Sequence, residues 1–450
     1  MTEGEKAYKI AERIFPICRS ITGNGVRETL RILKDYLPEL EIKEVPSGTQ
    51  CFDWTVPKEW NIKDAWVKDK NGKKIIDFSE TNLHVMGYSI PVHKKVRLQE
   101  LMSCLYTQQN QKDVIPYITS YYKERYGFCI TENQKLKMLT DYSDNDEFEI
   151  FIDSALEDGF LTYGELRLDS TINDNGGGWY NCIDKNEILF STYICHPSMA
   201  NNECSGPAVA VLLADKIKRL KETGELKNYT YRFIFIPETI GSIMYLSKHL
   251  DYLKEHLLAG FNLTCVGDDR TYSFVNTRYA DTLADKLLEN VLKFHYPSYK
   301  KYSFLERGSD ERQYNAPGVD LPVCTFSRSL FHNYPEYHTS ADDLGMISPA
   351  GLQGAFDVMS KCVVALEYNE KYKINCLCEP QLGKRGLYPT VSQKGTYDAV
   401  KTMTDFIAYA DGRNDLIEIS NIIGVPVDEL IEIVKKLNQN NLLEASESKR

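Results

Sequence analysis

Four polar features of the sequence each follow a hydrophobic run of strand length. These features are His196, Glu238, the pair Asp268 and Asp269, and the pair Tyr337 and His338. Imidazole and carboxylate groups are the usual zinc donors, and a carboxylate can also move protons. A lone histidine at a strand end is usually structural. Two histidines, a glutamate and an aspartate pair at one sheet edge would instead indicate a hydrolytic metal site.

The hydrophobic runs alternate with helical patterns, which is the arrangement that would bring these side chains together. The runs are EILFSTYIC, YTYRFIFIP, GFNLTCVG and LPVCTFSR, within residues 187–328, and amphipathic segments of helix length separate them. Such alternation predicts an α/β fold with a mixed, mostly parallel-cored sheet between layers of helices. Ligands of these sheets bind beyond the carboxyl ends of the strands.

The rest of the chain divides into further segments. Residues 48–140 alternate apolar and polar side chains and carry hairpin signals, which predicts an inserted β-rich domain that ends in a tyrosine-rich helix near 118–127. Residues 148–169 are expected to form a hairpin. The catalytic domain would then comprise 1–47 and 141–375, followed by a linker at 376–394 and a winged-helix-like domain at 395–450. The glycine-rich stretch 173–178 is interpreted as a turn.

Composition limits the class of protein. The formal net charge of −11 gives no general attraction to nucleic acid or to an anionic membrane. No apolar run approaches the roughly 20 residues of a membrane-spanning helix, and the N-terminus lacks a signal-peptide pattern. The 12 cysteines are scattered without zinc-finger spacing, which is typical of reduced thiols. These observations predict a cytoplasmic protein without a membrane partner.

Several motifs resemble those of a known family. CHPSMANNECSG, FIFIPETIGS, GSDERQY and YPEYHTSADDL are similar to motifs of the zinc aminopeptidases with a phosphorylase/hydrolase-like fold, the clan of leucine aminopeptidases and glutaminyl cyclases. The greatest similarity is to bacterial aminopeptidase-like proteins with an inserted domain and a C-terminal winged helix. The resemblance covers roughly 1–47 and 141–370, and Tyr337–Thr339 followed by ADD is its most specific part.

The resemblance implies a role for each matching residue. It makes His196 the first zinc ligand and His338 the last. Glu238 matches the general base, and Tyr337 matches a donor to the developing oxyanion. The implied reaction is zinc-dependent hydrolysis of a peptide or small amide bond.

The sequence departs from the two-zinc members of the family at three ligand positions. Asn202 stands where an aspartate bridges both metals, and Thr239 replaces a second glutamate. Thr264 occupies the position of an aspartate ligand, which leaves Asp268 as a substitute. A neutral amide brings no charge to two cations, so one zinc is expected, although two are not excluded. Alternatively, Glu238 itself binds the metal and another acid is the base.

Four further residues near these motifs are candidates for supporting roles. They are Glu203, Asp269, Asp310 and Arg312, which could orient a ligand or bind the substrate. Arg19 and Arg27, near the first loop, also match the bacterial group, and either a pocket or a structural role is open.

Two alternatives remain open from the sequence. The departures at the ligand positions also fit a degenerate peptidase fold that binds a ligand without hydrolysing it. The C-terminal domain could contact DNA or a protein, and the acidic residues of DELIEIVKKLNQNN favour a protein. Homo-oligomerisation is a further candidate property.

Overall fold

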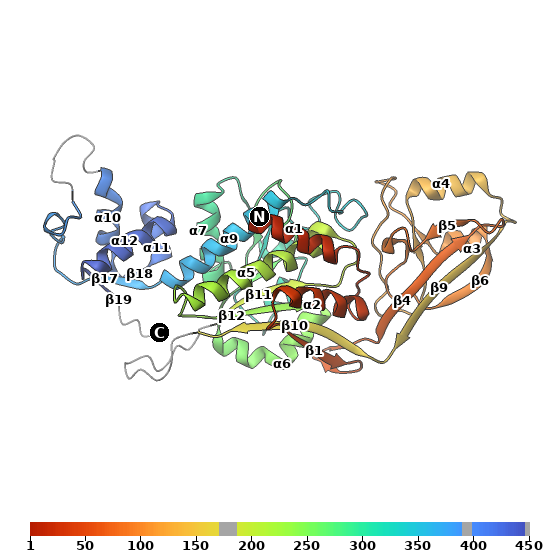
Figure 1. Ribbon diagram of the computed structural model, residues 1–450, viewed down its shortest axis with the longest axis horizontal. Helices are drawn as coiled ribbons and strands as arrows, with labels where there is room; N and C mark the ends of the chain where they lie inside the picture. Colours follow the sequence, from red (N-terminus) through yellow and green to blue (C-terminus); the bar gives the residue numbers. More distant parts are fainter. Residues whose placement is uncertain (171–186, 389–397, 446–450) are drawn as a thin grey trace.

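The computed structural model describes residues 1–170, 187–388 and 398–445, which form three parts in a row (Figure 1). The central part contains an eight-stranded sheet in the order β1-β10-β12-β11-β13-β16-β14-β15. Its strands are β1 (Glu41–Pro46), β10 (Phe160–Leu168), β11 (Glu187–Tyr193), β12 (Thr230–Ile236), β13 (Leu257–Leu263), β14 (Ser273–Val275), β15 (Lys300–Tyr302) and β16 (Val323–Ser327). The central pairs, from β12 to β16, are parallel, and β1, β10 and β14 add antiparallel pairs. The predicted mixed sheet with a parallel core is therefore confirmed.

Helices cover both faces of this sheet (Figure 1). One face packs against α1 (Glu3–Ile14), α2 (Asn24–Tyr36), α5 (Ser205–Glu222), α7 (Leu283–His295) and α9 (Pro349–Tyr368). The other face packs against α6 (Ile240–His256) and the short helix α8 (Glu311–Tyr314). The sheet is thus enclosed, as parallel strands require.

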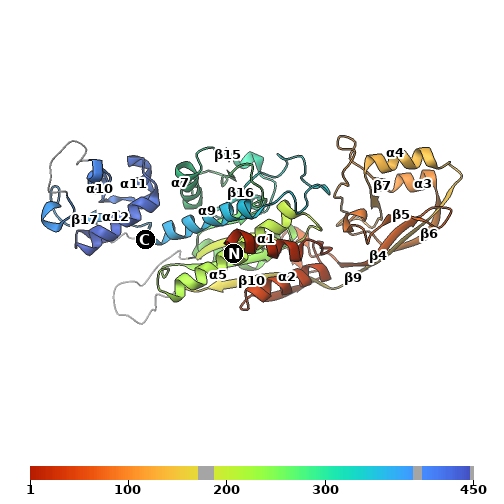
Figure 2. The ribbon, with the colours of Figure 1, turned by 45° about the horizontal axis from the view of Figure 1, so that its top comes forward.

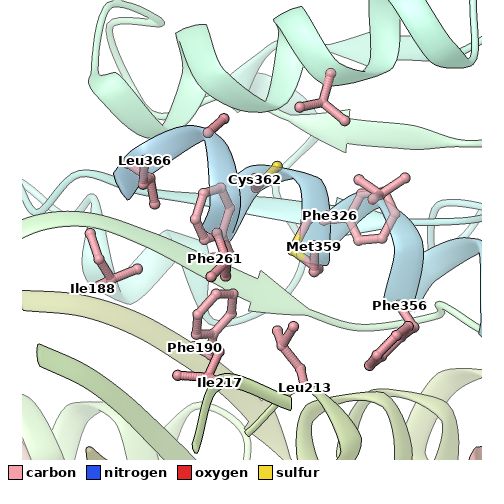
Figure 3. Packing of buried hydrophobic residues seen from close by; sticks show 14 of the residues in the cluster. Ile188, Phe190, Leu213, Ile217, Phe261, Phe326, Phe356, Met359, Cys362 and Leu366 are labelled. Atoms are coloured by element: carbon pink, nitrogen blue, oxygen red, sulfur yellow. The ribbon is translucent and has the colours of Figure 1, made fainter. Parts of the chain in front are cut away.

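β11 shows why the strand ends are well placed. Its side chains are buried on both faces: Ile188 and Phe190 point to the layer of α5 and α9, and Leu189 points to the layer of α6. Figure 3 shows Phe190 stacked beside Phe261 of β13, with ring centroids 5.5 Å apart. A register shift would move all these side chains to the wrong face. Burial of these side chains therefore fixes the register of β11 and the position of its end.

The inserted domain is built around a second sheet, in the order β5-β4-β9-β6. Its strands are β4 (Glu59–Lys68), β5 (Lys74–Asp77), β6 (Val92–Arg97) and β9 (Glu147–Glu157). Short strands β2 (Gln50–Cys51), β3 (Trp54–Thr55), β7 (Leu105–Tyr106) and β8 (Phe128–Cys129) and helices α3 (Leu98–Ser103) and α4 (Glu132–Asp141) complete it. The sheet includes β9, which the sequence analysis assigned to the catalytic domain.

Two local predictions for this region were wrong. β9 and β10 do not form a hairpin, because β9 pairs with β4 and β6 whereas β10 pairs with β1 and β12. The segment 118–127 is not a helix. Its backbone bonds to Gly87 instead, through Ser120 N to Gly87 O and Gly87 N to Ile118 O, both 2.9 Å. Non-local pairing replaced the local structure that composition suggested.

The C-terminal part is a helical domain with a small sheet. It contains α10 (Asp398–Tyr409), α11 (Leu416–Ile423), α12 (Val427–Gln439) and the strands β17 (Lys371–Ile374), β18 (Asp411–Asp415) and β19 (Leu443–Ala445). β17 lies between β18 and β19, so residues 371–374 join this sheet and not the central one. The stretch 173–178, interpreted above as a turn, lies outside the described residues. No helix within the described ranges has the length and apolar character needed to span a membrane.

Candidate active site

The parallel strand order brings His196, Glu238 and His338 to one edge of the sheet. His196 lies just beyond β11, Glu238 just beyond β12, and His338 in the loop after β16. The imidazole rings of His196 and His338 have centroids 5.1 Å apart. The distance from His196 Nε2 to Glu238 Oε2 is 3.8 Å. Three of the residues singled out from the sequence therefore share one site.

The ring of His196 is held by the loop that follows it. Residues Ala200–Cys204 form a π-helical turn, η2, which carries Glu203 back toward the histidine. Glu203 Oε2 lies 2.8 Å from His196 Nδ1, and both side chains are almost fully buried. Burial lowers the pKa of His196, but the charge and hydrogen bond of Glu203, together with the charge of Glu238, outweigh it and raise the pKa overall. Because Glu203 binds Nδ1, Nε2 is left to face Glu238.

Arg19, from the N-terminal segment, contacts both His196 and Glu203. Its Nε donates to the backbone oxygen of His196 at 3.0 Å and lies 3.7 Å from Glu203 Oε1. Arg19 is 1% exposed, so the ion pair is shielded from solvent. It positions both the histidine and the carboxylate that orients it.

The position of Glu238 is set by strained backbone next to it. Thr239 has a φ of +64°, a region that a β-branched residue rarely adopts and that costs roughly 1–3 kcal/mol. Asp310 Oδ1 accepts hydrogen bonds from Thr239 N and Ser242 Oγ, both at 2.8 Å. Arg312 Nη2 donates to Thr239 Oγ1 at 2.6 Å. Asp310 and Arg312 thus stabilise the turn that points Glu238 at His196.

The acids of the site have perturbed pKa values. Burial raises the pKa of Glu238, although His196 and Arg312 oppose the shift. Burial, and then the charge of Glu238, raise the pKa of Asp310 to about 7. Groups with such shifts are typical of functional sites.

One ring nitrogen of His338 is a candidate metal ligand. Its φ is +54°, and its Nε2 is buried without a hydrogen-bond partner among the described residues. Burial and the neighbouring His196 hold its pKa well below the usual value, which keeps the imidazole neutral. Tyr337 stacks on this ring with centroids 3.9 Å apart, and its hydroxyl has no hydrogen bond within the described part of the chain.

The loop after His196 is anchored by a residue that sequence reasoning did not single out. Asp342 accepts hydrogen bonds from the backbone N–H groups of Asn201 and Asn202, at 2.6 and 3.0 Å. Burial raises the pKa of Asp342 to about 7. Asn202 Nδ2 donates to Tyr193 Oη at 2.6 Å, while its Oδ1 is buried without a partner in the described structure. The motif that contains Asp342 was the available signal for this role.

Two predicted residues have other contacts. Asp268 is buried, and its carboxylate accepts from Ser329 N and Ser329 Oγ, both at 2.9 Å, and from Asn201 Nδ2 at 3.1 Å. Asp269 accepts from Ser348 Oγ at 2.6 Å, at the start of α9. Both carboxylates bind loop groups, and neither has a hydrogen bond to a site histidine.

The inserted domain covers the histidines. Tyr117 lies with its ring centroid 5.0 Å from His196 and 5.2 Å from His338. Its backbone N–H donates to His338 O at 2.9 Å, and its hydroxyl lies 2.7 Å from that of Tyr121. The sequence offered only the richness in tyrosine near this position as a signal. The two tyrosines cover the site on the side of the inserted domain.

Unpartnered atoms concentrate here. Among the described residues, 14 buried side-chain polar atoms lack a hydrogen-bond partner, and 5 of them belong to predicted site residues. These 5 residues are Asn202, Glu203, Asp310, Arg312 and His338. Buried polar groups are normally satisfied, so such a concentration indicates a place for a ligand or water.

A compact group of metal-binding side chains surrounds the other nitrogen of His196. Across the described ranges, the group with donor atoms within 4.8 Å of one another is Cys195, His196 and Glu203. Cys195 Sγ accepts the N–H of Glu238 at 3.2 Å and lies 3.4 Å from His196 Nδ1. The cluster therefore gives the first histidine a second candidate metal position.

Comparison with known proteins defines the family. Residues 8–369 match the model described as a domain of unknown function, DUF4910, and residues 370–445 match a winged helix-turn-helix model. The chain belongs to the DUF4910 family. It is 45% identical over 419 residues to a candidate polysaccharide biosynthesis protein with an aminopeptidase-like domain from Clostridium acetobutylicum, with 93% of this chain and 91% of that protein covered.

Solved structures show the same fold. The crystal structure of a candidate peptidase from Clostridium acetobutylicum is similar with a TM-score of 0.86 and 42% identity, and covers 98% of this chain and 96% of its own. A zinc aminopeptidase from Bacillus subtilis has a TM-score of 0.54 at 14% identity, covering 80% and 94%. The DUF4910 chain thus has an aminopeptidase-like fold with a C-terminal winged helix.

Proposed function

We propose that the chain is a zinc-dependent aminopeptidase-like hydrolase that cleaves a peptide or small amide bond. The observation that carries the proposal is the convergence of His196, Glu238 and His338 at one sheet edge, with the ring of His196 oriented by Glu203. The aminopeptidase-like fold supports it. A reducing compartment such as the cytoplasm is proposed as its location, since the described cysteines are unpaired thiols.

We assign one zinc ion to donors on the Nε2 side of His196. His196 Nε2 is directed away from Glu203, and two buried atoms without hydrogen-bond partners in the described structure, His338 Nε2 and Asn202 Oδ1, are suitable donors. Zinc held there would act as a Lewis acid on the scissile carbonyl and would lower the pKa of bound water. The amide of Asn202 contributes no charge, which favours one ion over two.

The remaining residues have separate roles. Glu238 takes a proton from the attacking water and passes it to the leaving amine. Asp310 and Arg312 position Glu238 through Thr239. Tyr337, with its unbonded hydroxyl, donates to the oxyanion. Tyr117, which packs on both histidine rings, and Tyr121, bonded to it, shield the site from water.

Metal content tests the proposal. After zinc repletion and exhaustive dialysis, elemental analysis should find about one zinc per chain, lost in His196→Ala and His338→Ala and retained in the exposed control His93→Ala. Cys195→Ala should keep zinc, because that thiol belongs to the alternative position. Retention of zinc in His338→Ala together with its loss in Cys195→Ala would place the metal beside Glu203 instead.

Turnover tests the general base. Glu238→Gln keeps the shape of the side chain but cannot accept the proton, so hydrolysis of aminoacyl amides should fall by about 100-fold or more with zinc content unchanged. Wild-type activity in this variant would remove Glu238 from the role. A chain that retains no zinc and hydrolyses no amide would instead be a ligand-binding member of the fold.

A further inference from the structure

A pocket lies between the catalytic domain and the winged helix, away from the two histidines. Its volume is about 470 Å³, and its walls come from α5, α7, α9 and α12. Figure 1 shows α12 beside the end of α9, on the side of the molecule opposite the inserted domain. None of the lining residues belongs to the candidate active site.

Ion pairs across the domain boundary hold the pocket in shape. Asp428, at the start of α12, lies 3.0 Å from His295 Nε2 of α7 and 3.1 Å from Lys361 Nζ of α9. Lys435 Nζ, further along α12, lies 5.5 Å from the ring centroid of Tyr368. Asp428 therefore has its partners already and is part of the wall.

Two charged side chains of the pocket form no ion pair within 4 Å, and one buried hydroxyl has no hydrogen bond, among the described residues. Lys216 has no ion pair within 4 Å among the described residues, and its ammonium lies 5.1 Å from the ring of Phe356. Burial lowers the pKa of this half-buried group, while the charges of Asp357 and Glu3 oppose the shift from a longer distance. Asp357 accepts one hydrogen bond, from Gln353 Nε2 at 2.9 Å, and has no cationic partner within 4 Å in the described structure. Ser360 is 5% exposed, and its Oγ has no partner in the described chain.

The chemistry of these groups defines the ligand. One cation and one anion that make no direct ion pair, together with one hydroxyl, share the pocket with apolar side chains of Val291, Val364 and Ile431. We propose that the pocket binds a free α-amino acid with an apolar side chain. Its carboxylate would meet Lys216 and the hydroxyl of Ser360, its ammonium would meet Asp357, and its side chain would contact the three apolar residues.

Binding at this place couples the two domains. The ligand contacts α9 and α12 together, so it stabilises the docked winged helix, and docking strengthens ligand binding by the same factor. An amino acid of this class is also what an aminopeptidase releases. The inference itself stands on the pocket alone and holds whether or not the chain hydrolyses amides.

Calorimetric titration with L-leucine tests the inference. The titration is done in full-length His196→Ala protein, so that binding at the candidate active site is removed. Leucine should bind, whereas leucinamide, which lacks the carboxylate, and 4-methylpentanoate, which lacks the ammonium, should bind at least about tenfold more weakly. No heat of binding with leucine up to about 10 mM, or equal binding of leucinamide, would overturn it.

Pocket variants locate the site. Lys216→Met and Asp357→Asn should each weaken leucine binding by about tenfold or more, and Ser360→Ala should weaken it less. Lys293→Met removes an exposed lysine of α7 and should change nothing. If thermal unfolding shows that Lys216→Met is not folded, Ser360→Ala and Asp357→Asn decide the question. Unchanged affinity in the folded pocket variants would contradict the proposal.

Discussion

At the scale of single residues, Glu203 shows how a neighbouring position takes over a charge. Asn202 carries no charge, and Glu203 directly follows it. The π-helical turn η2 places the Glu203 carboxylate on Nδ1 of His196, on the side away from Glu238. Glu203 is therefore better placed to orient His196 than to bridge two metals.

This role predicts a specific defect in Glu203→Gln. The amide keeps the size of the side chain but loses the charge that fixes the proton on Nδ1, so zinc affinity should fall about 10–100-fold. The dissociation constant is measured by competition with a coloured chelator. Glu222→Gln changes an exposed residue of α5, the helix that follows η2, and serves as control. Unaltered zinc affinity in Glu203→Gln would show that the contact has no role in metal binding.

The sequence predicted the position of some site residues and not of others. His196, Glu238 and His338 were predictable because each follows a buried strand, and parallel strands end at the same edge. The left-handed backbone conformation of Thr239 was not predictable from the sequence. It depends on contacts with Asp310 and Arg312, which lie over 70 residues away along the chain. Tyr117 was missed for the same reason, since only tertiary pairing brings the inserted domain onto His338.

At the scale of elements, an ion pair joins the N-terminal helices to the inserted domain. Arg27 of α2 binds Glu59 of β4 through two hydrogen bonds, of 2.8 and 2.5 Å, and Glu44 of β1 at 3.0 Å. The guanidinium of Arg27 lowers the pKa of Glu59 to about 2 from its ordinary value of 4.5. Two-point contacts of this kind fix orientation as well as distance.

The lowered pKa predicts how the stability of this junction varies with pH. The carboxylate contributes stability fully above pH 4.5, and the contribution is lost as the pH falls toward 2. Because Glu59 is partly exposed, Arg27→Gln should cost only about 1 kcal/mol of unfolding free energy at pH 7. The difference from wild type should shrink at pH 3.5 in urea titrations.

The matched control is Arg13→Gln, which removes the exposed pair with Asp35 on the same two helices. It should cost less than about 0.5 kcal/mol at either pH. A loss in Arg27→Gln that stayed constant from pH 7 to pH 3.5 would indicate packing, and not the charge of Glu59, as the source.

Element types were easier to predict than element partners. The hydrophobic runs of the central sheet were correct because length and periodicity alone define a buried strand. The strands β9 and β10 were also recognised, but their partners lie in different sheets, and no local pattern specifies that choice. The strand β17 was not predicted at all, because its sheet partners β18 and β19 lie far along the sequence.

At the scale of the whole molecule, the inserted domain and the winged helix lie at opposite ends of the aminopeptidase-like domain (Figure 2). The inserted domain reaches the site directly, through Tyr117, whereas the winged helix contacts the far end of α9. Separate contacts therefore hold the inserted domain over the histidines and the winged helix on α9.

The docked position of α12 predicts that the full chain does not bind DNA tightly. In a helix-turn-helix the second helix enters the major groove, and here that helix is α12. Asp428, at the start of α12, pairs with Lys361 of α9 and His295 of α7. The N-terminal end of the helix, which would approach the bases, therefore contacts the neighbouring domain instead. Its own acids and the net charge of −11 repel phosphate as well.

An electrophoretic assay with a 30-base-pair duplex of random sequence measures this directly. At about 50 mM salt, where phosphate contacts are strongest, about 10 µM full-length protein should shift no DNA. Lys361→Ala weakens the docking contact without altering α12, so any binding that appears only in this variant would show that docking, and not charge, prevents DNA binding. A salt-dependent shift by the wild-type chain at submicromolar concentration would mean that α12 is released or that another face of the domain binds DNA.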